Sequence, residues 1–137
     1  MLVKDVMDLK PSALHEEDTI LSASKYMKAE RIRNLPVINK GNKLVGLITL
    51  REIIETVFTD PARILVKDAM IKIVACVEPE VPLKDAIEVM LKNKYGCLPV
   101  IDSNKKLIGM LTEAHLLKTL LEFTTLPDGL LKARSKN

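Results

Sequence analysis

Hydrophobic positions along the second half of the chain predict a strand, a helix, two further strands and a closing helix. A short apolar segment over 71–77 indicates the first strand, and 113–121 indicates the last helix. Between them, apolar residues recur at the spacing of one face of an amphipathic helix. These residues are Leu83, Ala86, Ile87, Met90 and Leu91.

The first half of the chain predicts the same elements. Its first helix carries a matching stripe, with Asp18 or Thr19 as the N-cap, and the stripe consists of Ile20, Ala23, Ser24 and Met27. Two strands follow over 35–39 and 44–49, joined by a predicted hairpin turn at 40–42, and 102–105 occupies the corresponding place later in the chain. A second helix is expected over 50–58.

These similarities form an internal repeat with a constant offset of 63 residues, as from Val3 to Val66. The offset carries VKDVM at 3–7 onto VKDAM at 66–70, LPVI at 35–38 onto LPVI at 98–101, and Thr49 onto Thr112. Because the register holds without a gap from Val3 to about Phe58, it indicates a duplicated unit.

We therefore predict an α+β fold of two β-α-β-β-α repeats, 1–61 and 62–124, followed by a flexible tail at 125–137. A unit of about 60 residues buries only a modest fraction of its surface. Packing the two sheets together with pseudo-twofold symmetry, helices outside, would cover both. Such packing leaves clefts between the repeats, and these are natural ligand sites.

Composition and charge disfavour several classes of function. The net charge is +3 with mixed signs and the aromatic content is 3%, so nucleic-acid binding is not expected. No apolar run approaches the roughly 18 residues of a membrane span, and no signal peptide opens the chain. Cys76 and Cys97 lie in apolar runs, which favours free thiols in the cytoplasm. The two histidines, His15 and His115, lie far apart in the sequence, so a metal cluster is not expected. The sequence also contains no recognisable catalytic triad, so an enzyme is not expected.

The order and repetition of these motifs resemble the CBS domain, named after cystathionine β-synthase. The motifs that resemble the family are the VKDVM-like opening, the LPVI strand and the G-x-x-T strand end. The resemblance extends from Val3 to about Phe123. A tandem pair is a Bateman module, and this chain resembles a stand-alone one. The resemblance implies a regulatory module that binds AMP, ADP, ATP or S-adenosylmethionine between its repeats. It also implies a homodimer and a regulated enzyme or transporter as partner.

The resemblance also implies which residues line two clefts. The first would use Thr49, Arg51, Glu52, Arg33 and Asn34, with a wall of Met70, Ala75, Tyr95 and Gly96 from the other repeat. The second would use Thr112, His115, Gly96 and Cys97, with a wall of Met7, Ser12, Ile32 and Arg33.

Both clefts depart from the family pattern at the acidic residue expected to grip the ribose. Glu52 keeps the charge on a longer side chain, whereas His115 cannot offer a bidentate acceptor. The first cleft is therefore the better nucleotide candidate. Thr49 and Glu52 also fit a capping box, so ligand contact and helix capping stay open as alternatives.

The other candidates have ordinary alternatives too. Arg33 and Arg51 suit phosphate, because a guanidinium group matches its oxygens, but both could be solvated surface residues. Tyr95 could stack on adenine, or the preceding helix could simply end at Gly96. The substituted acidic positions favour a second interpretation of the whole chain, a protein-interaction module whose clefts no longer bind nucleotide.

Overall fold

The computed structural model describes residues 1–124, so the predicted tail at 125–137 lies outside the described residues. The first repeat contains β1 (Leu14–His15), α1 (Ile20–Glu30), β2 (Asn34–Ile38), β3 (Leu44–Thr49) and α2 (Leu50–Glu55), preceded by a short 3-10 helix η1 (Val3–Asp5). The second contains α3 (Val66–Ala69), α4 (Leu83–Asn93), β4 (Cys97–Ile101), β5 (Leu107–Thr112) and α5 (Glu113–Glu122). The predicted mixed fold of two repeats is confirmed.

The sheets follow the predicted hairpins. β1 pairs in parallel with β2, and β2 pairs antiparallel with β3, so that Asn34 lies opposite Thr49. β4 and β5 form the equivalent hairpin, with Cys97 opposite Thr112. In the first turn, the side chain of Asn39 accepts hydrogen bonds from the backbone N–H groups of Gly41 and Lys43. The hairpin turn predicted at 40–42 is therefore present.

The expected strand over 71–77 is not a continuous strand, which corrects that prediction. Its two ends pair with different sheets: Ile71 bridges to Leu47 of β3, and Val77 bridges to Val100 of β4. The residues between them cross from one repeat to the other. Ala75 and Val77 pack, partly buried, against the second repeat, whereas Ile73 is 96% exposed, so this apolar run does not reflect one regular pairing pattern.

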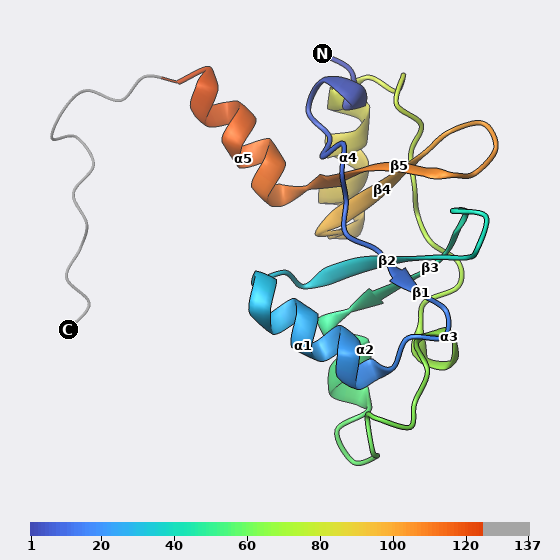
Figure 1. Cartoon of the computed structure of the whole chain (residues 1–137). Coiled ribbons are helices and arrows are strands. Elements are labelled where there is room, and N and C mark those ends of the chain that lie inside the picture. Colours follow the sequence, from blue (N-terminus) through green and yellow to red (C-terminus); the bar gives the residue numbers. More distant parts are fainter. Residues whose placement is uncertain (125–137) are drawn as a thin grey trace, which may run out of the picture.

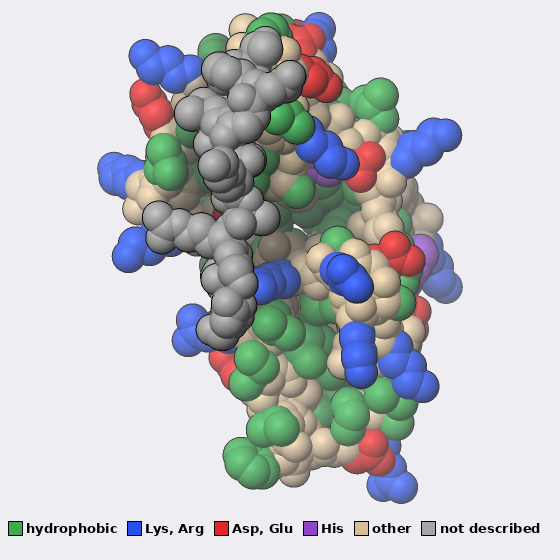
Figure 2. Space-filling model, turned by 90° about the vertical axis from the view of Figure 1, so that its left-hand side faces the viewer, with side chains coloured by type: hydrophobic (Ala, Val, Ile, Leu, Met, Phe, Trp, Pro, Cys, Tyr) green, Lys and Arg blue, Asp and Glu red, His purple; other side chains and the backbone are tan. Residues whose placement is uncertain are grey.

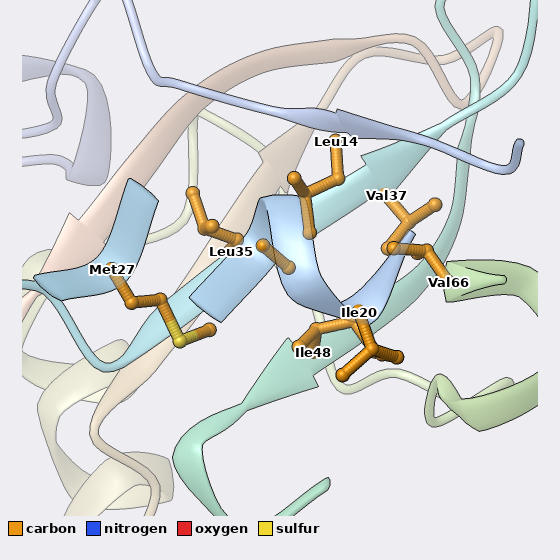
Figure 3. Packing of buried hydrophobic residues seen from close by; sticks show 8 residues of the cluster. Leu14, Ile20, Met27, Leu35, Val37, Ile48 and Val66 are labelled. Atoms are coloured by element: carbon orange, nitrogen blue, oxygen red, sulfur yellow. The ribbon is translucent and has the colours of Figure 1, made fainter. Parts of the chain in front are cut away.

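Each repeat contributes its opening segment to the core of the other repeat. Val3 is fully buried in the cluster around α4, β4 and β5, and the backbone N–H group of Val3 donates to the carbonyl of Val81 at 2.9 Å. Val66 is fully buried in the cluster around α1, β2 and β3, and its N–H group donates to the carbonyl of Asp18 at 2.7 Å. Figure 3 shows Val66 beside Val37 in that core.

The two sheets meet at the centre of the molecule, where a third apolar cluster contains Ile38, Cys97, Leu107 and Met110. Figure 1 shows α1 and α2 on the side of the first sheet that faces away from the second repeat. The hairpin tips also pair, since the N–H group of Leu44 donates to the carbonyl of Lys105 and that of Leu107 donates to the carbonyl of Asn42, each at 3.0 Å. The repeats are thus interlocked about a pseudo-twofold axis.

Candidate functional site

A cleft of about 640 Å³ opens between the repeats, where the strands β3 and β5 run into the helices α2 and α5. Figure 2 shows a hollow between the two halves of the molecule, with lysine and arginine side chains around it. Both repeats contribute equivalent positions to its lining. The lining residues are Arg31, Ile32, Arg33, Asn34, Thr49, Leu50, Arg51, Lys94, Gly96, Thr112, Glu113 and Ala114.

The local structure explains why these residues meet. α1 and α4 each end at a residue in the left-handed conformation, Arg31 at φ 55° and Lys94 at φ 58°, which turns the chain directly into the next strand. The backbone N–H group of Leu50 then donates to the carbonyl of Arg33 at 2.9 Å, and that of Glu113 donates to the carbonyl of Gly96 at 3.3 Å. Each helix start is thereby held against the strand entry of its own repeat.

Seven of the predicted site residues line this single cleft. They are Arg33, Asn34, Thr49, Arg51 and Gly96 of the first predicted cleft, and Ile32 and Thr112 of the second. The structure therefore brings parts of both predicted sites together. Five further lining residues were not predicted from the sequence, namely Arg31, Leu50, Lys94, Glu113 and Ala114. The repeat offset relates Arg31 to Lys94, and that paired basic position was the available signal.

Glu52 does not face the cleft, because its carboxylate caps its own helix. Oε1 of Glu52 accepts from the backbone N–H group of Thr49 and from the Thr49 hydroxyl, each at 2.6 Å, and only 7% of the residue is exposed. The Thr49 hydroxyl in turn accepts from the N–H group of Arg51 at 3.2 Å. The capping box is the arrangement present, and a ribose role for Glu52 stays a prediction that requires this carboxylate to turn.

His115 forms a related contact with its imidazole, through the hydroxyl of the N-cap residue Thr112. The Thr112 hydroxyl and Nδ1 of His115 lie 2.6 Å apart, and the backbone N–H group of His115 donates to that hydroxyl at 3.2 Å. Both residues at the expected acidic positions are thus turned toward helix termini. The proposed ligand contacts of His115 remain untested predictions.

We expect Glu52→Ala to lower the free energy of unfolding by about 1 kcal/mol, because two donors at the start of α2 lose their acceptor. Glu55→Ala is the matched control, since Glu55 lies in the same helix, is exposed and pairs only with Arg51 among residues 1–124. Urea denaturation of both variants measures the difference. Equal stability of the two variants would contradict the capping role.

The other predicted wall residues are occupied in packing. Met70 lies across Gly46, and Met7 lies across Gly109. Ala75 packs against the core of the second repeat, and the Ser12 hydroxyl is hydrogen-bonded to Tyr26. As the side chains stand, these residues lie outside the lining of the cleft, and their roles as ligand walls stay predictions.

Tyr95 is not in the lining of the cleft, and its role in stacking on adenine stays a prediction. It lines an apolar groove of about 680 Å³ between α4 and α5, together with Leu91 and Leu120. The alternative that the helix ends at Gly96 is also corrected, because Lys94 is the C-cap residue and adopts the left-handed conformation. Gly96 therefore lies two residues beyond the cap, in the lining of the cleft.

Cys97 is a buried thiol at the sheet interface, not part of the cleft lining. Burial, and secondarily the nearby carboxylate of Glu113, raises the pKa of Cys97 to about 11. A thiol held in its neutral form is a poor nucleophile. Within residues 1–124 no group of three or more His, Cys, Asp or Glu side chains is placed to hold a metal ion.

The raised pKa of Cys97 predicts a loss of stability at alkaline pH. Above pH 9 the unfolded thiol ionises while the folded thiol stays neutral, so the unfolded state binds fewer protons and is favoured. By pH 10 this should remove about 1 kcal/mol from the free energy of unfolding. The measurement is the stability of the parent protein relative to Cys97→Ala from pH 8 to 11, and a difference that does not vary with pH would refute it.

Comparisons with known proteins all point to one family. The CBS domain model matches residues 3–58 and again residues 66–122. An inosine-5'-monophosphate dehydrogenase of Methanocaldococcus jannaschii is 35% identical over 86% of this chain, but the chain spans only 22% of that enzyme.

Two solved structures share the fold. The CBS domain pair of protein MJ0100, solved with 5'-methylthioadenosine and S-adenosylmethionine, has a TM-score of 0.79 at 23% identity and covers 90% of this chain and 98% of its own. CBSX2 from Arabidopsis thaliana, solved with AMP, has a TM-score of 0.80 at 24% identity and covers 89% and 97%. No helix within residues 1–124 is long and apolar enough to cross a membrane. With a duplicated unit, interlocked cores and two matches to one family model, this chain belongs to the CBS domain family as a tandem CBS pair.

Proposed function

We propose that this chain is a regulatory module that binds an adenosine-containing ligand, namely AMP, ADP, ATP or S-adenosylmethionine, in the cleft between its repeats. The observation that carries the proposal is the composition of that cleft. Hydroxyl groups from both repeats and guanidinium groups from the first repeat line one open volume, through Thr49, Thr112, Arg33 and Arg51, with Asn34 beside them. Guanidinium and hydroxyl groups are suitable donors to phosphate and ribose oxygens.

Binding at this position would act on the relation between the repeats. The cleft is lined from both sides, so a bound ligand contacts both repeats at once. A ligand shifts the balance between two arrangements only by its different affinity for them. We propose that the resulting change in repeat or dimer geometry is the signal to a regulated enzyme or transporter. MJ0100 and CBSX2, which were solved with adenosine compounds, support this class of ligand.

The test is a thermal-shift and calorimetric titration of the protein with AMP, ADP, ATP and S-adenosylmethionine. A ligand that binds only the folded state raises the melting temperature by mass action, by an amount that grows with concentration above its Kd. Guanosine nucleotides serve as the control for adenine recognition. The absence of binding by all four adenosine compounds at millimolar concentration would reject the proposal.

A second candidate is a dimerisation or protein-interaction module that does not bind nucleotide. It is favoured by the caps, because Glu52 and His115 are already hydrogen-bonded within their own helices. Apolar side chains on α5 are also exposed, including Leu117 at 64% and Leu121 at 66%. This candidate predicts a melting temperature that nucleotides do not change.

Both candidates include a homodimer formed through the helices. The groove between α4 and α5 and the exposed apolar residues beside it would be covered by a second copy of the chain. Replacing Leu117 and Leu121 by glutamate should give a monomer in light scattering, whereas the same change at exposed Lys92 and Asn93 should leave the dimer intact. We further propose a non-enzymatic role in the cytoplasm, supported by the free thiols of Cys76 and Cys97.

A further inference from the structure

The charges lining the cleft are unequal between the two repeats. The first repeat contributes three cationic side chains, Arg31, Arg33 and Arg51, whereas the second contributes Lys94 and the carboxylate of Glu113. Four cations and one carboxylate therefore line the cleft among the described residues. The lining as a whole is positively charged although the folded chain carries both signs almost equally.

The repeat offset shows which residue differences between the two repeats make their charges in the cleft unequal. Arg31 corresponds to Lys94, which keeps the charge, but Arg33 corresponds to Gly96 and Arg51 corresponds to Ala114. The remaining carboxylate, Glu113, stands where the first repeat has Leu50. A pseudo-symmetric cleft has thereby acquired a cationic side and a side with an acidic group.

The arginines on the cationic side are available to a ligand. Arg31 and Arg33 are exposed and form no ion pair within residues 1–124. Nε of Arg51 lies 3.2 Å from Oε1 of Glu55, with both side chains largely exposed to solvent. An exposed pair of this kind is weak and gives way to a stronger anion. Guanidinium groups bind phosphate oxygens in a bidentate manner, so three of them suit more than one phosphate group.

We infer that the cleft selects an adenosine polyphosphate, with the phosphate chain along Arg31, Arg33 and Arg51 and directed away from Glu113. This inference rests on the proposed function and names the ligand class within it. Each added phosphate gains attraction from the cationic side, so ATP and ADP bind more tightly than AMP. S-adenosylmethionine carries a sulfonium cation and a net positive charge, so the same lining disfavours it.

The experiment compares AMP, ADP, ATP, S-adenosylmethionine and inorganic tripolyphosphate by calorimetry in magnesium-free buffer of low ionic strength. We expect ATP to bind about tenfold or more tightly than AMP, because one additional charge-assisted contact has about that value. S-adenosylmethionine should bind most weakly of the adenosine compounds, and tripolyphosphate should compete with ATP. Added salt should weaken ATP binding more than AMP binding.

Variants that remove either a positive or a negative charge from the cleft provide a sharper test. Arg33→Gln and Arg51→Gln should each weaken ATP about tenfold while changing AMP less, and Glu113→Gln should strengthen ATP. Arg63→Gln is the matched control, because Arg63 is an exposed arginine outside the cleft lining whose partner is Asp60. Urea denaturation of each variant checks that the fold is retained.

The outcomes separate this inference from the proposed function. Equal affinities for AMP and ATP, tighter binding of S-adenosylmethionine, or no effect of Arg33→Gln and Arg51→Gln would overturn the inference while nucleotide binding stands. If no adenosine compound binds but tripolyphosphate binds in an Arg33-dependent manner, the proposed function fails and the anion-selective cleft remains. If tripolyphosphate also fails to bind, both are rejected.

Discussion

A fragment of residues 8–71 should fold cooperatively, whereas a fragment of residues 1–61 should remain largely unfolded. The two fragments have similar lengths and share α1, β2, β3 and α2, so they differ mainly in which opening segment they contain. The fragment 8–71 keeps α3 and Ile71, which pack on the first repeat. The fragment 1–61 keeps η1 instead, whose Val3 packs on the second repeat.

The expected difference is large because the exchanged segment completes a small core. Val66 is fully buried against the first repeat, and Ile64 and Met70 pack beside it. Burying one such side chain contributes about 1.5–3 kcal/mol. The segment also supplies paired backbone hydrogen bonds, with the N–H groups of Ile71 and Leu47 donating to each other's carbonyls at 2.9 and 3.0 Å. A unit of about 60 residues has a small free energy of unfolding, so losing these contacts should be enough to unfold it.

Circular dichroism and urea denaturation of the two fragments provide the measurement. Both fragments expose the same inter-repeat surface, including Ile38, Leu44 and Leu47, so that surface cannot account for a difference between them. Mixing 1–61 with 62–124 should restore structure, because the exchanged segments are then supplied in trans. If the fragment 8–71 were no more stable than the fragment 1–61, the result would contradict the conclusion that each repeat packs its opening segment on the other repeat.

The elements that the sequence predicts well are those with a local signal. The helices α1 and α4 have apolar stripes that pack into the core. Thr19 is the N-cap residue of α1, and its hydroxyl accepts a hydrogen bond from the N–H group of Ser22 at 3.1 Å. The hairpins have turn residues and a duplicated register. For these elements the repeat supplied a second, independent observation of each pattern.

The exchange of opening segments has no such local signal. Periodicity shows that Val3 and Val66 are apolar, but it does not show which of two similar cores receives them. The same ambiguity explains the segment 71–77, whose apolar residues serve two sheets rather than one strand. The predicted division at residues 61 and 62 stays a prediction, and the fragment experiment tests it directly.

The site shows a similar division between local and spatial information. Thr49 and Thr112 end equivalent strands by the repeat offset, and the resemblance to the CBS domain implied that both lie at a cleft. Sequence spacing left two roles for Glu52, because a capping box and a ribose contact need the same residues. Only the direction of the carboxylate distinguishes them, and that direction depends on side-chain rotation. Arg31 and Glu113 were missed because their position in the cleft depends on both repeats together.

Gly109→Ala should lower the free energy of unfolding by about 3 kcal/mol, and Gly46→Ala should have an effect of similar size, at the upper end of overpacking changes. A Cβ atom on Gly109 would lie 2.7 Å from Sδ of Met7 and 2.9 Å from the carbonyl oxygen of Asp8. On Gly46 it would overlap Sδ of Met70 and lie 3.0 Å from the carbonyl oxygen of Ile71. The methionine can move, but the carbonyl belongs to a paired backbone.

These contacts give a physical reason for a glycine at the same place in both repeats. Each glycine lies where the opening segment of one repeat crosses a strand of the other, so a side chain there would push the exchanged segments apart. Gly41→Ala is the matched control, because a Cβ atom there would meet only the Asn39 Oδ1 atom at 3.4 Å, an ordinary contact. Urea denaturation should separate the variants clearly. Adding Met7→Ala to Gly109→Ala should recover only part of the loss, since the Asp8 carbonyl stays in place, whereas full recovery would show that the sulfur alone excludes a side chain at this crossing.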